Sequence, residues 1–472
     1  MDVEHLKPRR KQDGPVYLQL YRRYREAIST GKLKPGDRVP SVRSLASELS
    51  LARGTVEMAY EMLASEGYFV ARGAAGTIVS PRLENLPDPD KGTAAARPAH
   101  QASYPSLSAQ GEPRPFQLGL PALDAFPRKV WARLAGRNVR ILETEAMISP
   151  DPAGYAPLRR AIAAYLGISR GIVCAPEQVF VTTGYWGALE LVRRALLQAG
   201  DQGWYEDPGY IHARSWLERA GMRLEPVPVD DEGLDVEMGE RLAPRARFAV
   251  VTPTHQSPMG MALSLPRRLA LLEWAKRSQA WIIEDDYDSE FRYHGRPLPA
   301  LKSLDRDGRV LYNGTFSKVL FPGLRLAYLV VPLSQAGRFR DAVDHLAGPG
   351  SILLQSMVAD FMEQGHFVRH LRKMRGLYAA RRGYLVDALA QTMEDRLHVQ
   401  PQAGGIHVLA HLRTGQDDKA LAAAARARGL AVQALSDWRV RQGSQSGLLM
   451  GFANLATPAD ALRAVRRLAQ VL

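Results

Sequence analysis

Apolar residues at helical spacing predict three short helices near the start of the chain. In 16–30 they recur every three or four residues. Two further helical patterns, at 41–49 and 53–66, are separated by only a short break, which is typical of a helix-turn-helix. Residues 68–80 then alternate around a glycine-containing turn, the pattern of a hairpin. Three helices and a hairpin predict a winged helix-turn-helix.

The pattern changes between residues 81 and 115, where Pro, Ala, Ser and Gly are scattered with no apolar periodicity. This composition is typical of a linker, and its prolines favour extended conformations. We therefore expect a winged helix-turn-helix domain at 1–80, a linker at 81–115 and a second domain at 116–472.

Beyond the linker, apolar runs of about five residues alternate with helical stretches. Four clear runs begin at Val179, Phe248, Trp281 and Val310. This alternation predicts an α/β domain with a mostly parallel sheet. Polar residues follow three of the runs in the segments TTG, EDDY and GTFSK. Sheets of this kind bind ligands at the carboxyl ends of their strands, so a site is expected there.

Length, composition and charge add one hypothesis to this picture. The 472 residues correspond to several domains, and 46% hydrophobic with 24% charged residues is typical of folded proteins. The net charge of +13 favours an acidic partner such as nucleic acid or a membrane surface. Residues 1–80 contain 13 Lys and Arg against 9 Asp and Glu, so the first domain is basic, although most of the excess lies elsewhere.

Cysteine usage and hydropathy indicate the cellular setting. Cys174 is the only cysteine, which excludes an intrachain disulfide and a cysteine-based zinc site within one chain, and no metal site is predicted. The N-terminal segment has no apolar signal region, and no run reaches the ~18 apolar residues of a membrane span. We expect a cytoplasmic protein with no membrane partner.

Three segments of the first domain form a specific set. They are Gly-x-Leu-x-Pro-Gly-x-x-x-Pro-Ser-x-Arg at 31–43, Arg-x-Thr-Val at 53–56 and Gly-x-x-Val at 76–79. Together they resemble the DNA-binding domain of the GntR family, with one departure at Ala52, where the family often has serine. Without them, this pattern would more often be a packing unit. The resemblance implies binding of double-stranded operator DNA. The candidate contacts are Ser41, Arg43, Arg53, Thr55, Arg72 and Gly76.

The polar residues at the predicted sheet edge also form a set. Lys318 follows one strand, Asp285 and Tyr287 follow another, and a Thr-Gly-Tyr segment at 183–185 joins a third strand to a helix. Taken together they resemble pyridoxal-phosphate enzymes of fold type I, the aspartate aminotransferase class, over about 116–472. The resemblance implies that pyridoxal 5'-phosphate is bound by Lys318, Asp285, Tyr287, Tyr210, Thr183, Gly184, Tyr185, His255, Thr315, Ser317 and Arg325.

The resemblance gives each group a role. Lys318 would form a Schiff base with the cofactor, which needs a neutral amine. Asp285 would keep the ring nitrogen protonated, Tyr287 would hydrogen-bond the ring oxygen, and Tyr210 could stack on the ring. The phosphate would be bound by backbone N–H groups, hydroxyls and a guanidinium, from 183–185, Thr315, Ser317 and Arg325.

Two departures bear on activity. Where aminotransferases commonly have Asn-Pro-Thr-Gly, residues 257–260 read SPMG, and His255 or Gln256 could supply the missing hydrogen bond. The arginine that usually holds the substrate carboxylate near the C-terminus has no counterpart in 447–455, and two nearby arginines are out of register. We therefore expect weak transamination of ordinary amino acids, although a transaminase half-reaction could remain.

The domain order resembles the MocR/PdxR subfamily of GntR-family transcriptional regulators along almost the whole chain. The resemblance implies a homodimeric regulator that binds pyridoxal phosphate and senses either the cofactor itself or an amine or amino-acid effector. Two alternatives stay open: an active aminotransferase with a DNA-tethering domain, and a regulator whose second domain is a dimerisation scaffold without cofactor.

Overall fold

The computed structural model describes residues 14–73, 76–81, 112–142, 144, 148, 150–293, 295, 298–346, 348, 350–413, 415–441, 443 and 445–471. The chain divides into two compact units, which in the described residues comprise 14–81 and 112–471. Most of the predicted linker, 82–111, lies outside the described residues. Its last residues already belong to the large unit, since Ala431 donates a backbone hydrogen bond of 2.8 Å to Pro115.

The N-terminal unit contains the predicted three helices and hairpin. These are α1 (Val16–Ser29), α2 (Val42–Leu49), α3 (Arg53–Ser65), β1 (Phe69–Ala71) and β2 (Thr77–Val79). The two strands are antiparallel, with Phe69 opposite Val79. The winged helix-turn-helix prediction is therefore confirmed.

An aromatic core fixes the helices of this unit relative to one another. The rings of Tyr24, Tyr60 and Phe69 meet edge to face, with centroids 5.1 to 5.7 Å apart. Tyr60 donates its hydroxyl proton to the carbonyl of Pro40 at 2.9 Å, so Tyr24 is the donor in the 3.0 Å contact between the two hydroxyls. These contacts tie α1 and α3 to the segment that begins α2.

An eight-stranded sheet forms the centre of the large unit. Its strands are β3 (Val179–Thr182), β4 (Gln202–Asp207), β5 (Arg223–Asp230), β6 (Gly233–Leu234), β7 (Phe248–Val251), β8 (Trp281–Asp286), β9 (Val310–Thr315) and β10 (Ala327–Val330). Their order is β3-β10-β9-β8-β7-β4-β5-β6. This confirms the predicted α/β architecture.

Most neighbouring strands in the sheet are parallel. The pairs β9–β8, β8–β7, β7–β4 and β4–β5 are parallel, whereas β10 is antiparallel to both β3 and β9. The carboxyl ends of β3, β9, β8, β7 and β4 therefore meet at one edge, together with the amino end of β10. The segments expected to carry the cofactor-binding residues all reach this edge.

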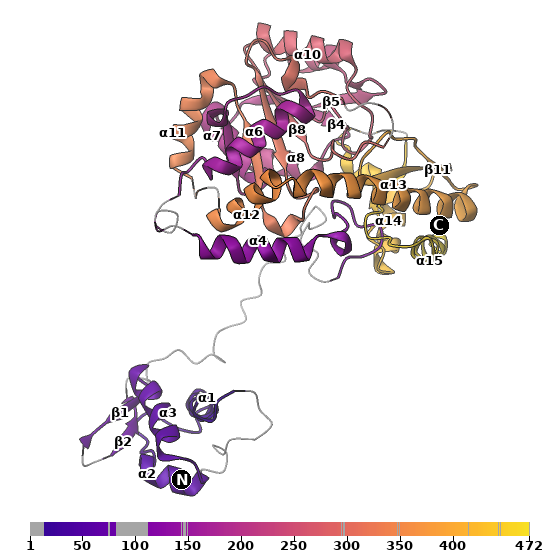
Figure 1. Cartoon of the computed structure of the whole chain (residues 1–472). Helices are drawn as coiled ribbons and strands as arrows, with labels where there is room; N and C mark the ends of the chain where they lie inside the picture. Colours follow the sequence, from indigo (N-terminus) through magenta and orange to yellow (C-terminus); the bar gives the residue numbers. More distant parts are fainter. Residues whose placement is uncertain are drawn as a thin grey trace. The chain divides into compact units, whose positions relative to one another are not determined.

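Helices surround the sheet and continue toward the C-terminus (Figure 1). They are α4 (Arg128–Arg140), α6 (Ala156–Arg170), α7 (Tyr185–Leu196), α8 (Ile211–Arg219), α9 (Val236–Leu242), α10 (Leu265–Arg277), α11 (Ala336–Asp344), α12 (Ile352–Glu363), α13 (His366–Met393), α14 (Asp418–Ala427) and α15 (Pro458–Ala469). Within the described ranges, none is long and apolar enough to cross a membrane.

The sequence patterns did not predict a second, antiparallel sheet in the large unit. It contains β11 (Leu397–Val399), β12 (His407–Leu412), β13 (Gln433–Ala434) and β14 (Gly447–Gly451), in the order β11-β12-β14-β13. Helix α13 connects the two sheets, since it follows the helices of the first and leads directly into β11 (Figure 1).

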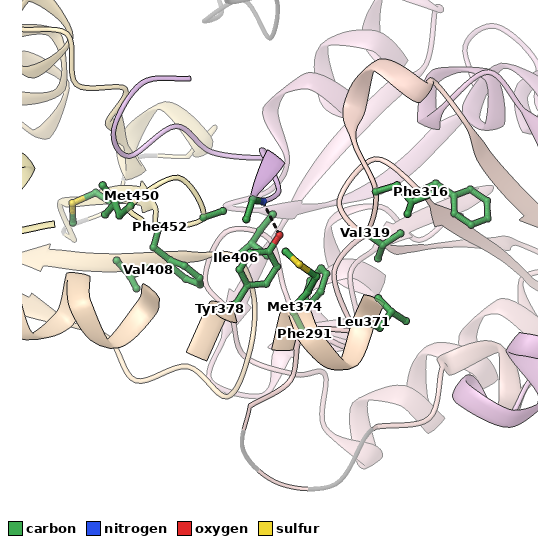
Figure 2. Close-up of a cluster of buried hydrophobic side chains, with 14 of the residues drawn as sticks. Phe291, Phe316, Val319, Leu371, Met374, Tyr378, Ile406, Val408, Met450 and Phe452 are labelled. Carbon is green, nitrogen blue, oxygen red and sulfur yellow. Dashed lines mark hydrogen bonds between the residues drawn. The ribbon is translucent and has the colours of Figure 1, made fainter. Parts of the chain in front are cut away.

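Buried side chains of α13 join the two parts of the large unit (Figure 2). The ring of Tyr378 meets Phe291 edge to face at 4.9 Å and Phe452 at 6.2 Å. Its hydroxyl accepts a 2.9 Å hydrogen bond from the backbone N–H of Ala122, 256 residues away. Tyr378 therefore fixes the segment that leads from the N-terminal edge of the large unit to the site.

We expect Tyr378→Phe to destabilise the large unit, because it leaves the buried amide of Ala122 without a partner. The expected loss is about 1–3 kcal/mol of unfolding free energy, measured by urea unfolding followed by tryptophan fluorescence. Tyr384→Phe on the same helix is the control, with an expected change below about 0.5 kcal/mol. Equal effects of the two substitutions would contradict this role of Tyr378.

Candidate functional site

A cavity of about 410 Å³ lies at the edge where the strands meet. This volume is within the range of small-molecule sites. Of the residues expected from the sequence, nine line it: Gly184, Tyr185, Tyr210, Asp285, Tyr287, Thr315, Ser317, Lys318 and Arg325. Thr183 and His255 are the two expected residues that do not.

Lys318 follows β9 and places its amine in the cavity. Nζ donates a 2.9 Å hydrogen bond to the carbonyl of Gly119. Burial lowers the pKa of Lys318, while the carboxylates of Asp288 and Asp285 act in the opposite direction. Gly119 has a φ of +76°, which favours glycine, and a Cβ there would lie 2.6 Å from Nζ, so a larger residue would displace the amine from its present position. The site thus favours the neutral, nucleophilic form of the lysine.

Asp285 is the carboxylate that faces the cavity from the end of β8. Burial raises its pKa to about 7, and hydrogen bonding to Asn313 and Tyr185 only partly offsets this. Asn313 donates to Asp285 at 3.2 Å, and the buried Tyr185 hydroxyl is a second, less well aligned partner of the same carboxylate. A buried carboxylate of this kind is stabilised by a cationic ligand group.

An anion site is built where α7 begins. Gly184 is the N-cap residue of α7, with a φ of +78°, and the guanidinium of Arg325 lies beside it. Thr315 and Ser317 line the same region, and the Thr315 hydroxyl accepts a 3.1 Å hydrogen bond from the backbone N–H of Ser317. The helix N-terminus, hydroxyls and a guanidinium are suitable groups for a phosphate.

Tyr287 connects the cavity to a buried histidine. His255 Nδ1 lies 3.0 Å from the Tyr287 hydroxyl and 3.0 Å from Asp288 Oδ1. His255 does not line the cavity itself but lies behind two residues that do, Tyr287 and His407, whose ring centroid is 5.9 Å from that of His255. The cavity is lined here by Ser257 and Pro258 and not by His255. These two residues stand where aminotransferases commonly have Asn-Pro.

Gln256, the other residue considered for the missing asparagine, has a structural role. Its amide donates to the carbonyl of Pro208 at 2.8 Å and to Glu206 at 3.2 Å. It is buried and does not line the cavity.

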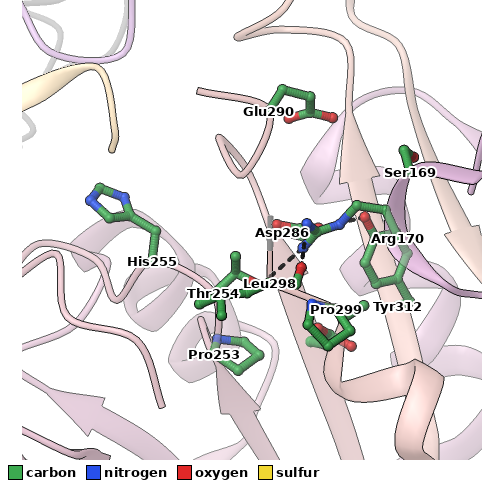
Figure 3. Close-up of polar contacts among 12 residues, drawn as sticks. Ser169, Arg170, Pro253, Thr254, His255, Asp286, Glu290, Leu298, Pro299 and Tyr312 are labelled. Carbon is green, nitrogen blue, oxygen red and sulfur yellow. Dashed lines mark hydrogen bonds and ion pairs between the residues drawn. The ribbon is translucent and has the colours of Figure 1, made fainter. Parts of the chain in front are cut away.

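Beside these site segments, a buried arginine joins the ends of β7 and β8 (Figure 3). Arg170, the last residue of α6, lies 2.7 Å from Asp286 and donates to Thr254 at 2.9 Å. Asp286 also accepts a 2.6 Å hydrogen bond from Tyr312. Thr254 precedes His255, and Asp286 follows Asp285. By binding both Thr254 and Asp286, Arg170 therefore fixes the relative position of these two site segments.

Several cavity residues could not be identified from sequence motifs. Asn313 lies inside β9, and its partner Asp285 is known only once β8 and β9 are paired. His407, Gln433 and Trp438 come from the second sheet and its connections, which sequence periodicity missed. Burial lowers the pKa of His407 to about 4.

The expected DNA-contact residues lie along the helix-turn-helix and its wing. Arg43 in α2, Arg53 at the start of α3 and Arg72 after β1 are exposed. Ser41 caps α2, since its hydroxyl accepts from the Ser44 N–H at 3.1 Å.

Gly76 has a φ of +89° in the wing, where a Cβ would lie 3.2 Å from the guanidinium of Arg38. Arg38 is a basic group of this surface that motif reasoning missed.

Thr55 is half-buried in the first turn of α3, and Ala52 gives that helix no side-chain cap. The departure from the usual serine therefore leaves a helix start without a side-chain cap, where backbone N–H groups are suited to an anionic ligand.

The cavity fits the group that the resemblance implies. Asn313 Oδ1 is a buried atom of a lining residue without a hydrogen-bond partner among the described residues. A lysine with a lowered pKa, a carboxylate and an anion site thus surround one space. This donor set suits a flat ring bearing a phosphate, a basic nitrogen and an aldehyde.

Fold and site together define a helix-turn-helix regulator fused to an aminotransferase-like unit. The family model for aminotransferase class I and II matches residues 125–465, and that for bacterial regulatory proteins of the gntR family matches residues 16–79. The probable rhizopine catabolism regulatory protein MocR of Rhizobium meliloti is 39% identical, with 94% of this chain and 92% of that protein covered. The pyridoxine biosynthesis transcriptional regulator PdxR of Corynebacterium glutamicum is 33% identical, with 93% and 92% covered.

Solved aminotransferase structures resemble the large unit. An archaeal alanine:glyoxylate aminotransferase has a TM-score of 0.70 at 26% identity, covering 76% of this chain and 91% of the enzyme. The α-aminoadipate aminotransferase LysN of Thermus thermophilus, complexed with N-(5'-phosphopyridoxyl)-L-leucine, has a TM-score of 0.68 at 30% identity, with 76% and 91% covered. The chain belongs to the MocR/PdxR group of GntR-family transcriptional regulators, and its N-terminal unit is a DNA-binding helix-turn-helix domain.

The raised pKa of Asp285 leads to a prediction about pH. Between about pH 4 and 7 the folded protein holds a proton that the unfolded chain has released, so this group lowers stability as pH rises. Asp285→Asn should therefore stabilise the cofactor-free protein more at pH 8 than at pH 5, by on the order of 2 kcal/mol in urea unfolding. The exposed Asp231→Asn is the control. A gain from Asp285→Asn that is the same at both pH values would refute the prediction.

Proposed function

We propose that the large unit binds pyridoxal 5'-phosphate through Lys318, and that an amine or amino-acid ligand, or the cofactor itself, controls DNA binding by the N-terminal unit. The observation that carries this proposal is the position of Lys318. Its amine lies in the 410 Å³ cavity, and burial there lowers the pKa of the amine. When bound, the cofactor supplies an aldehyde that joins covalently to a lysine amine and can be passed to a ligand amine.

Each cavity residue has a defined task in this proposal. Asp285 pairs with the protonated ring nitrogen, which relieves the cost of its burial. Tyr287 donates to the ring oxygen and is oriented by His255. Arg325, with the start of α7, binds the phosphate. Tyr210 and Tyr185 supply aromatic surface beside the ring.

Control of DNA binding requires that the ligand has different affinities for two arrangements of the protein. We propose a homodimer as the controlled species, because fold-type-I sites are completed across a dimer in the related enzymes. Two helix-turn-helix units would then contact two half-sites of an operator.

The competing candidate is a working aminotransferase, which the 30% identity to LysN favours. Absorbance titration of the purified protein, first with pyridoxal phosphate and then with amines, tests the proposed function. Turnover of an amino acid with a keto acid at ordinary enzymatic rates, without a shift of operator DNA in a gel, would support the enzyme instead.

Lys318→Ala should abolish the visible absorbance band that develops when pyridoxal phosphate is added, because no other group would join the aldehyde in the cavity. Lys276→Ala is the matched control, since Lys276 pairs with Asp307 at 3.3 Å outside the cavity, and it should retain the band. A wild-type protein without any band would favour the scaffold alternative, and a band that survives in Lys318→Ala would disprove the assignment of this lysine.

Arg53→Ala should weaken operator binding by about 1–3 kcal/mol, because it removes a guanidinium from the start of the recognition helix. Fluorescence anisotropy with labelled operator DNA measures this loss. The same variant should keep its absorbance band on addition of pyridoxal phosphate. The opposite result, normal DNA binding with an altered band, would mean that the two units do not divide these tasks.

A further inference from the structure

One wall of the cavity is apolar and belongs to a separate hydrophobic cluster. Leu449 and Trp438 are buried in this cluster, and Leu118 and Tyr210 pack against it. All four also line the cavity. The rings of Tyr210 and Trp438 lie 5.9 Å apart. A ligand that extends from Lys318 toward this wall therefore meets leucine and aromatic side chains.

The polar groups at this wall are neutral. Gln433 accepts a 3.1 Å hydrogen bond from the indole N–H of Trp438, which leaves its amide NH₂ available as a donor. Burial lowers the pKa of His407 to about 4, so its imidazole is uncharged at neutral pH. Gln117 adds a second amide to the lining.

The two arginines nearest this wall in the sequence are held elsewhere. Arg439 donates to the carbonyl of Gln445 at 3.0 Å, and Arg441 lies 2.9 Å from Glu225. The backbone N–H of Arg441 is fixed by Asp207 at 2.9 Å. Among the described lining residues, the always-cationic side chain is Arg325, which the proposed function assigns to the phosphate, and Lys318 is the attachment point.

A carboxylate placed at this wall would lose its hydration without gaining a counter-ion. Burial of an unpaired charge is far more costly than burial of a hydroxyl that can hydrogen-bond to an amide. The wall therefore discriminates against α-amino acids and favours ligands whose body is uncharged.

Building on the proposed function, we propose that the effector is a primary amine that lacks a carboxylate and has an apolar or hydroxylated body. The ligand amine would join the cofactor aldehyde in exchange for Lys318, whose amine would be released. The apolar part would pack on Leu449 and Trp438, and hydroxyl groups would hydrogen-bond to Gln433 or Gln117. The sensor is thus specific for amines and amino alcohols over amino acids.

Matched ligand pairs test this assignment. The full-length protein loaded with pyridoxal phosphate is titrated with L-phenylalaninol and L-phenylalanine, and with L-alaninol and L-alanine, while the visible band and the melting temperature are recorded. Each amino alcohol should half-saturate at a concentration at least about tenfold below that of its amino acid. Half-saturation at equal or lower concentrations of the amino acids, or no response to all four ligands, would overturn the inference. If no band forms with pyridoxal phosphate, the proposed function itself is wrong.

Adding a cation to the wall should reverse the preference. Leu449→Arg places a guanidinium in the apolar cluster, and Gln117→Arg, at a half-buried position, is the alternative if the first variant does not fold. Either folded variant should bind L-phenylalanine more tightly than the wild type does. Arg439→Ala and Arg441→Ala should not change the half-saturation concentration of either ligand in a pair. A selective loss of amino-acid binding in either variant would show that these arginines serve the cavity and would contradict the inference.

Discussion

Two consecutive carboxylates are buried at the end of β8, and each needs a cationic partner or a proton. Because side chains alternate along a strand, Asp285 and Asp286 face opposite sides. Asp286 is paired with Arg170 at 2.7 Å and accepts from Tyr312, whereas the hydrogen-bonding partners of Asp285 are the neutral side chains of Asn313 and Tyr185. One carboxylate is thus neutralised by the protein, and the other is left with a pKa of about 7, in need of a cationic ligand group.

The same edge of the sheet supplies the complementary groups. The buried amine of Lys318 has a lowered pKa, and the guanidinium of Arg325 lies beside the start of α7. These groups are suited to a cofactor, whereas the apolar wall around Leu449 is suited to the uncharged body of a ligand that joins the cofactor. The large unit shares its fold with aminotransferases, so the fold alone does not decide what this site does.

The cavity-lining residues that could be named from the sequence lie next to strands with clear apolar patterns. Lys318, Asp285 and Tyr287 each follow such a strand, and parallel strands bring their carboxyl ends together. His255 shows the limit of this reasoning. Its position after β7 was expected to bring it to the site, but only the side-chain contacts show that it faces Tyr287 and Asp288 while Ser257 lines the cavity.

The sequence alone determined the order of the two units, the three helices and hairpin of the first, and the parallel sheet of the second, because these depend on local periodicity and motifs. Tertiary structure decided the rest. Gly119 meets Lys318 across 199 residues, and Gln433 and Trp438 reach the cavity from the two-residue strand β13 and the turn that follows it. Such contacts depend on packing between distant segments, which no local pattern records.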